Sequence, residues 1–327
     1  MKELTVKSGE SGQRFDKYLA RYLKEAPKSF LYKMLRKKNI TLNGKKADGS
    51  EKLQAEDTIQ LFFSDETLEK FMGQEKEAQV CPLEILYEDA DVLFINKPVG
   101  MLSQKAKKED VSLVEYLAGY LLKSGAMTKE DLQTFHPAVC NRLDRNTSGI
   151  VAAGKTMAGL QTLSEAFHDR SLHKYYLTIV GGVIDKPAYI KGYLVKNKET
   201  NHVTVTRKPV KDSLPIETRY TPVSCSKDRS VTLLKVELLT GRSHQIRSHL
   251  ASIGHPVAGD WKYGDSRLNR RYKEMYGVQS QLLHSWKLIL PAGKGELQNL
   301  SGLEIIAPVP ETFANVIKGE KINGEKI

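Results

Sequence analysis

Short apolar runs with strand-like alternation dominate the chain from residue 80 onward, and they constrain its fold more than any other feature. HKYYLTIVGG, PIETRYTPV and RSVTLLKVELL are examples, rich in β-branched and aromatic residues. Helical spacing is clearest in VSLVEYLAGYLLKSG, MAGLQTLSEAFHDRS and SHQIRSHLASIG. Because strands outnumber helices and do not alternate with them regularly, we predict an α+β fold with a mixed, largely antiparallel central sheet.

Residues 1–63 are predicted to form a separate, basic unit. RFDKYLARYL and SFLYKMLRKKN have the spacing of two short helices, and the Asn43-Gly44 pair between two apolar stretches predicts a hairpin turn. This segment has fourteen lysines and arginines against eight aspartates and glutamates. The unit therefore has the composition of an attachment module for a polyanion.

The remaining boundaries follow from composition. The length of 327 residues and a hydrophobic content of 40% favour two globular units. Residues 64–79 are acidic and weakly apolar, which predicts a linker. Residues 80–310 form the larger predicted unit, and residues 311–327 are expected to be a polar, frayed tail.

Net charge and cysteine usage narrow the class of protein. The formal net charge is +11 and the sequence pI is about 9.3, which favours nucleic acid as partner. Cys81, Cys140 and Cys225 lie far apart without C-x-x-C spacing, so neither a disulfide framework nor a zinc site is predicted. With no apolar leader and no membrane-length apolar run, we expect a cytoplasmic protein with no membrane partner.

One carboxylate stands among arginines in the turn-rich segment NRLDRNTSG. If this segment is extended, Arg142 and Asp144 point to one face and Arg145 to the other. At about 4 Å and an effective dielectric near 20, an Asp–Arg pair gains roughly 4 kcal/mol before desolvation is subtracted. Such an aspartate suits a nucleophile or an electrostatic stabiliser. Spacing alone favours the alternative of a surface ion pair beside a turn.

A second polar segment is LLTGRSHQIRSHLASIGHPVAGDWKYG. Ile246, Leu250 and Ile253 are spaced to face the core, which leaves His244 and Arg247 together on a flank of the predicted helix. That flank can reach a site.

The histidines of this segment do not predict a metal centre. His244, His249 and His255 lie on different faces or outside the helix, and no carboxylate has ligand spacing. Asp260, after Val-Ala-Gly, is interpreted as a turn residue. The chain also lacks G-x-G-x-x-G and Walker patterns, so no phosphate cradle for a cofactor is predicted.

Two adjacent tyrosines lie in the predicted strand HKYYLTIVGG. Tyr175 and Tyr176 must point to opposite faces, so we expect one in the core and the other at a groove. Aromatic packing alone would explain both.

Several of these segments, in this order, resemble a known family. ILYEDADVLFINKPVGM, NRLDRNTSG, KYYLTIVG and LLTGRSHQIRSHLASIGHPVAGDWKYG resemble the RluA-type pseudouridine synthases over about residues 80–308. QRFDKYL, PKSFLYKMLRKKNITLNGKKA and LQAEDTIQLFF resemble the S4 RNA-binding fold. The resemblance implies a pseudouridine synthase fold preceded by a small α/β S4-like domain.

The resemblance also implies roles for individual residues. Asp144 matches the catalytic aspartate, Arg247 its arginine partner, and Tyr176 the active-site tyrosine that follows a basic residue, here Lys174. Because Asp144 must be unprotonated in its role, a nearby Arg247 would favour it.

Contacts with RNA are expected from both units. Near the site we expect them from Arg142, Arg145, Arg242 and His244, and in the S4-like unit from Lys28, Arg36, Lys37, Lys38 and Lys45. Arg142 matches the arginine that helps to hold the position in the RNA from which the nucleotide has flipped out. One departure from the family is Asn141, where a histidine is usual, which puts local packing or RNA contact there in doubt.

The implied activity is isomerisation of specific uridines to pseudouridine without a cofactor or metal. The expected partner is RNA, most simply 23S ribosomal RNA, and the protein is expected to be a monomer. Three alternatives remain open: a synthase acting on transfer RNA, a catalytically inactive RNA chaperone or scaffold, and, more weakly, a carboxylate-pair glycosidase.

Overall fold

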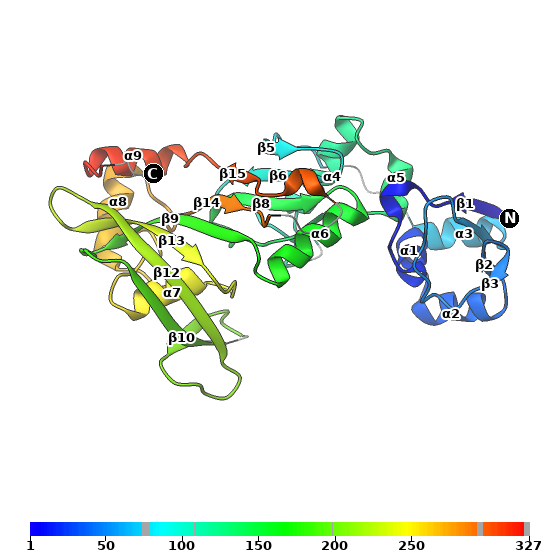
Figure 1. Cartoon of the computed structure of the whole chain (residues 1–327), viewed down its shortest axis with the longest axis horizontal. Coiled ribbons are helices and arrows are strands. Elements are labelled where there is room, and N and C mark those ends of the chain that lie inside the picture. Colours follow the sequence, from blue (N-terminus) through cyan, green and yellow to red (C-terminus); the bar gives the residue numbers. More distant parts are fainter. Residues whose placement is uncertain (74–78, 108, 198, 293–296, 324–327) are drawn as a thin grey trace.

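One mixed sheet organises the chain after residue 80 (Figure 1). Its strands follow the order β11-β10-β12-β13-β9-β14-β8-β6-β5, with β15 beside β14 and β7 beside β8. Among the described residues, every pairing in this sheet is antiparallel except the parallel pairing of β14 with β8. The predicted α+β fold is therefore confirmed. The computed structural model describes residues 1–73, 79–107, 109–197, 199–292 and 297–323.

The elements of this larger unit have the following bounds. The strands are β5 (Glu84–Glu88), β6 (Val92–Lys97), β7 (Ala138–Val139), β8 (Ser148–Gly154), β9 (His173–Gly181), β10 (Ala188–Lys196), β11 (Val203–Thr206), β12 (Leu214–Cys225), β13 (Val231–Leu238), β14 (Leu283–Ile289) and β15 (Glu304–Ile306). The helices are α4 (Leu113–Lys123), α5 (Lys129–Thr134), α6 (Met157–His168), α7 (Gln245–Ser252), α8 (Ser266–Tyr276), α9 (Glu311–Gly319) and the 3-10 turn η2 (Gln298–Leu300). Helices α4, α6 and α7 confirm the three helical predictions, whereas the polar helix α8 was not predicted.

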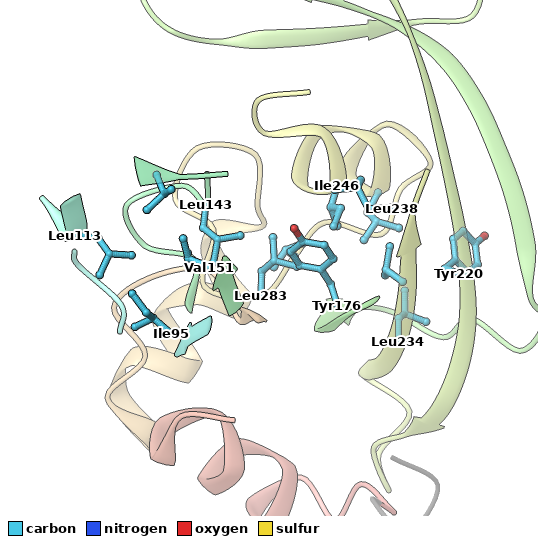
Figure 2. Close-up of a cluster of buried hydrophobic side chains, with 14 of the residues drawn as sticks. Ile95, Leu113, Leu143, Val151, Tyr176, Tyr220, Leu234, Leu238, Ile246 and Leu283 are labelled. Atoms are coloured by element: carbon cyan, nitrogen blue, oxygen red, sulfur yellow. The ribbon is translucent and has the colours of Figure 1, made fainter. Parts of the chain in front are cut away.

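Strands β6 and β8 are buried on both faces, because their alternate residues enter two separate core clusters. Ile95 and Val151 pack with Leu117 of α4 in one cluster. Phe94 packs with Leu163 of α6 in the other. This position explains their continuous apolar sequences. Figure 2 shows part of the first cluster, which extends to Leu143 and Tyr176 and so reaches the predicted site.

The N-terminal unit is a four-stranded sheet in the order β1-β4-β2-β3, packed with α1, α2 and a third helix that is described below. Asn43 and Gly44 both adopt positive φ in the β2–β3 connection, which confirms the predicted turn. The bounds are β1 (Lys2–Thr5), η1 (Ser8–Glu10), α1 (Phe15–Tyr22), α2 (Lys28–Arg36), β2 (Ile40–Leu42), β3 (Lys45–Lys46) and β4 (Thr58–Leu61).

Part of the predicted linker is a helix, contrary to expectation. Helix α3 (Asp65–Met72) begins at Ser64, whose side chain accepts a hydrogen bond from the Thr67 amide. Leu68 is buried, and the Phe71 ring lies 4.6 Å from that of Phe30, so α3 belongs to the core of the N-terminal unit. Composition indicated a linker because the segment has few apolar residues. Three of them nevertheless suffice to anchor so short a helix. Residues 74–78 of the predicted linker lie outside the described residues.

The expectation of a frayed tail is also wrong. Helix α9 buries Phe313 and Val316. Beyond it, the buried Glu320 accepts hydrogen bonds from Arg271 and Tyr276 of α8. Two apolar side chains one helical turn apart give this polar segment a face to bury. Residues 324–327 lie outside the described residues.

The two units contact each other through α1 and α5, which lie side by side in Figure 1. The buried Glu10 carboxylate accepts a hydrogen bond from the Thr134 hydroxyl, and Lys7 forms an ion pair with Asp131. None of the helices in the described residues is long and apolar enough to cross a membrane.

Gly149 is predicted to be essential for joining β8 to β14. Its φ is +109°, and an added Cβ would lie 2.2 Å from the Ser285 carbonyl oxygen. Gly149→Ala should therefore lower the free energy of unfolding by roughly 3 kcal/mol, measured by urea titration. Gly277→Ala is the matched control, because Gly277 also has positive φ (+69°) but open space around it, and should lose only about 1 kcal/mol. Equal losses would refute the steric explanation.

Candidate active site

The loop that carries Asp144 connects β7 to β8 and is fixed by the segment after β6. The Leu143 amide donates to Ser103 Oγ, and Ser103 Oγ donates to the Leu143 carbonyl, both at 3.0 Å. The Arg145 carbonyl accepts from the Gly100 amide at 3.0 Å and from Lys97 Nζ at 3.1 Å. Leu143 is also buried in the core, so the residues on both sides of Asp144 are fixed in position.

Arg247 joins two carboxylates. Its Nη1 donates to Asp144 Oδ2 at 2.8 Å, while Nε and Nη2 donate to the two oxygens of Asp260 at 2.7 and 2.9 Å. Burial alone would lower the pKa of Arg247, but the two carboxylates outweigh it and raise that pKa. The predicted pairing of Asp144 with Arg247 is thus present, with the arginine presented by α7.

Asp260 is the site residue that sequence reasoning missed. Its side chain is 0% exposed. Burial would raise the pKa of Asp260, but the hydrogen bonds and charge of Arg247 hold it below its ordinary value. Oδ1 also accepts from the Lys262 and Tyr263 amides at 2.9 and 3.2 Å, which is the turn that the sequence predicted. Nothing in the local pattern signals that the same carboxylate binds an arginine on the preceding helix.

Helix α7 faces the core with Ile246 and Leu250, as predicted, but Ile253 follows the end of the helix and is 36% exposed. His244 precedes the helix in a left-handed conformation, with φ of 55°. Its Nε2 lies 3.9 Å from Asp144 Oδ1. The predicted flank of His244 and Arg247 therefore does reach the site.

A hydrogen-bond chain orients the His244 imidazole. The Val203 amide donates to Tyr263 Oη at 3.0 Å, and that oxygen lies 2.8 Å from His244 Nδ1. The Tyr263 hydroxyl thus holds the ring at Nδ1, which leaves Nε2 on the side of Asp144. Burial lowers the pKa of His244, which favours the neutral ring.

Tyr176 lies on β9 with its side chain in the core cluster and at the cleft (Figure 2). Tyr175 is half-buried on the opposite face, as the strand alternation predicted. Burial, with a smaller contribution from Asp144, raises the pKa of Tyr176 to about 12. The phenol is therefore neutral near pH 7.

The site opens into a cleft of about 1120 Å³ that is rich in cations. Asp144 is the one carboxylate among its described lining residues. The lysines and arginines that line it are Lys105, Arg142, Arg145, Arg170, Lys174, Lys196, Arg242, Arg247 and Lys262. Of the predicted RNA contacts in this unit, Arg142, Arg145, Arg242 and His244 all lie here.

Asn141 fixes the start of the loop that carries Asp144. Its Nδ2 donates to the Ile150 carbonyl at 3.1 Å, and its Oδ1 accepts from the Ala152 amide at 2.8 Å. One amide side chain thus satisfies two backbone groups of β8, as a neighbouring strand would. The departure from the family pattern therefore has a local packing role.

The histidines considered for zinc have separate partners. His249 Nδ1 lies 2.9 Å from Thr218 Oγ1, and His255 Nδ1 lies 2.9 Å from the Gly181 carbonyl. Within the part of the chain that the structure describes, no group of three His, Cys, Asp or Glu residues has the arrangement of a metal site.

The five cations predicted in the N-terminal unit lie away from the cleft lining. All are exposed, on α2, just after it, and on β3: Lys28, Arg36, Lys37, Lys38 and Lys45.

Comparisons with known proteins agree with this fold. Residues 91–252 match the family model described as RNA pseudouridylate synthase, and residues 13–59 match the S4 domain. The chain is 31% identical over 297 residues to ribosomal large subunit pseudouridine synthase C of Pasteurella multocida, covering 88% of this chain and 85% of that protein. It is 30% identical over 328 residues to the protein of the same name from Escherichia coli, covering 95% and 94%.

A solved structure shows the same fold. Human RNA pseudouridylate synthase domain containing 4 superposes with a TM-score of 0.59 at 20% identity, over 73% of this chain and 94% of that one. Together with the relatives above, these matches show that the chain belongs to the RNA pseudouridylate synthase family, with an S4 domain at its N-terminal end.

Proposed function

We propose that this protein isomerises specific uridines to pseudouridine in 23S ribosomal RNA, with Asp144 as the catalytic aspartate and no cofactor. The observation that carries the proposal is a cleft whose described lining has one carboxylate, held by Arg247, among nine lysines and arginines. Such a cleft suits a polyanion, and the names of the relatives supply the ribosomal large subunit as its source. We further propose that the protein acts in the cytoplasm as a monomer.

The reaction breaks the N1–C1′ bond of uridine and forms a C5–C1′ bond, while C5 loses a proton and N1 gains one. Asp144 Oδ2 is held by Arg247, which leaves Oδ1 for the reacting nucleotide. A carboxylate fixed in this way serves either attack on the sugar or base, or stabilisation of a charged sugar intermediate.

The target base must first leave its stack, which costs a few kcal/mol in a folded RNA. Contacts of the cleft arginines with phosphates offset this cost, and the Tyr176 ring gives the flipped uracil a stacking surface. Since the pKa of Tyr176 is raised to about 12, we assign its phenol to stacking and hydrogen bonding rather than to accepting the C5 proton.

The geometry disfavours a carboxylate-pair glycosidase. Such an enzyme needs a second carboxyl group free to protonate or activate a reactant. Asp260 is close, but it is fully buried and both its oxygens accept hydrogen bonds from Arg247. Its role in our proposal is to hold Arg247 in position.

Asp144→Asn should abolish activity, because the amide keeps the shape and loses the charge. With uridine-5-tritiated large-subunit ribosomal RNA as substrate, we expect tritium release by the unaltered protein and essentially none by the variant. Tritiated transfer RNA in parallel distinguishes the two RNA classes.

Asp185→Asn is the control for Asp144→Asn, since this exposed carboxylate pairs only loosely with Arg229 and should keep full activity. Equal release by the Asp144→Asn variant would exclude a catalytic role for Asp144. Tight RNA binding by the unaltered protein without any release would favour the inactive scaffold.

Asp260→Asn should lower the free energy of unfolding by roughly 3 kcal/mol at pH 7, because it leaves the buried Arg247 poorly compensated. Asp144→Asn, at a carboxylate that is 25% exposed, should cost under about 1 kcal/mol. Because the folded-state pKa of Asp260 is depressed, the ionised carboxylate contributes fully to the free energy of unfolding above about pH 4, and this contribution is lost at lower pH. The free energies of unfolding of the variant and the unaltered protein should therefore converge at low pH. Urea titrations across pH measure this, and a gap independent of pH would contradict it.

The exposed cations of the S4 domain should contribute to RNA affinity through phosphate contacts. Replacing Arg36, Lys37 and Lys45 by Gln should reduce the slope of log Kd against log salt by about 2. The matched control replaces three exposed cations of α8 and α9, at the other end of the long axis (Figure 1): Arg270, Lys273 and Lys318. An unchanged slope in the first variant, measured by filter binding, would exclude these contacts.

A further inference from the structure

Lys174 is a buried cation without a protein anion. It lies on β9, is 7% exposed, and lines the cleft. Among the described residues, its ammonium has no hydrogen-bond acceptor and no ion-pair partner; the Phe167 ring lies 6.0 Å away. Its three N–H donors therefore have no acceptor among the described residues, in a side chain that lines the cleft.

Two other lysines, the buried Lys97 and the largely buried Lys155, show how the fold normally satisfies such a group. Lys97 Nζ donates to three backbone carbonyls at 2.9 to 3.1 Å. Lys155 Nζ lies 2.6 Å from Glu88 Oε1 and donates to the Asp89 carbonyl at 2.7 Å. Lys174 has neither kind of partner, although burying an uncompensated charge is costly.

The surroundings of Lys174 increase this cost. Burial lowers the pKa of Lys174, and the positive charge of Arg170 lowers it further. Arg170 and Arg142 line the same cleft. These three cations line one cleft, and no ion pair with a carboxylate is found for any of them among the described residues, so an incoming anion would stabilise them.

The position of Lys174 defines where that anion lies. Lys174 and Tyr176 are two residues apart on one strand, so they share a face at a separation of about 7 Å. A nucleotide whose base stacks on Tyr176 carries its nearest phosphates within reach of a lysine side chain at that distance.

We propose that Lys174, with Arg170 beside it, binds an RNA backbone phosphate directly adjacent to the uridine that enters the site. The inference rests on the proposed function and adds a phosphate subsite to it. The subsite fixes the register of the strand over Asp144, because a base can enter only when its neighbouring phosphate occupies the subsite.

The first test compares Lys174→Gln, Lys174→Arg and Lys155→Gln in binding the same tritiated ribosomal RNA. Lys174→Gln should bind about tenfold more weakly and reduce the slope of log Kd against log salt by about 0.7. Lys174→Arg should restore both, and Lys155→Gln, which removes a lysine already paired with Glu88, should change neither. An unchanged affinity and slope in Lys174→Gln would overturn the proposal.

Stability without RNA separates this role from a structural one. Because Lys174 has no partner in the described residues, Lys174→Gln should unfold at the same or a higher urea concentration than the unaltered protein. A clear loss of stability would show that Lys174 serves the fold, and would count against the subsite.

The second test removes the charge from the RNA. A synthetic stem-loop around the uridine that the unaltered protein modifies carries one methylphosphonate linkage, moved along the strand. The unaltered protein should lose about tenfold in affinity at one linkage next to that uridine, and Lys174→Gln should lose nothing further there. Equal losses for both proteins at every linkage would refute the subsite, whereas absence of tritium release by the unaltered protein would refute the proposed function instead.

Discussion

The site depends on one guanidinium shared by two carboxylates. Arg247 binds the fully buried Asp260 through two nitrogens and Asp144 through the third. The first pair is local, between α7 and the turn after it, and fixes the arginine fork; the second crosses 103 positions of sequence. Because the geometry of the fork is planar and rigid, fixing one side against Asp260 determines where the Asp144 carboxylate lies on the other.

The sheet brings these parts together through the placement of β14. This late strand lies between β8, which follows the Asp144 loop, and β9, which carries Lys174 and Tyr176. It pairs in parallel with β8 and antiparallel with β9, so the two halves of the sheet meet along it. Gly149 allows the close approach of β8 to β14 at this junction. The candidate site thus lies where two otherwise antiparallel halves of the sheet are joined.

Hydrophobic periodicity predicted the sheet class and the helices α1, α2, α4, α6 and α7, because each buries an apolar face. It did not predict α3, α8 and α9, because these segments have few apolar residues and read as polar. Only the structure shows the neighbouring core in which those few residues are buried. At the site, spacing identified charges around Asp144, but the partnership with Arg247 came from the family resemblance. Asp260 was missed because its turn and its arginine contact use the same carboxylate, and only the first is a local pattern.

The order of the strands also determines when the central sheet can assemble during synthesis of the chain. Strand β14 spans Leu283–Ile289, yet its place in the sheet is between β8 and β9, which leave the ribosome more than a hundred residues earlier. Until β14 emerges, β8 and β9 have unpaired edges and cannot be joined. A nascent chain therefore holds Asp144 and Tyr176 more than a hundred residues before the strand that joins their two halves of the sheet, and the open edges of β8 and β9 are exposed to wrong pairing in that interval.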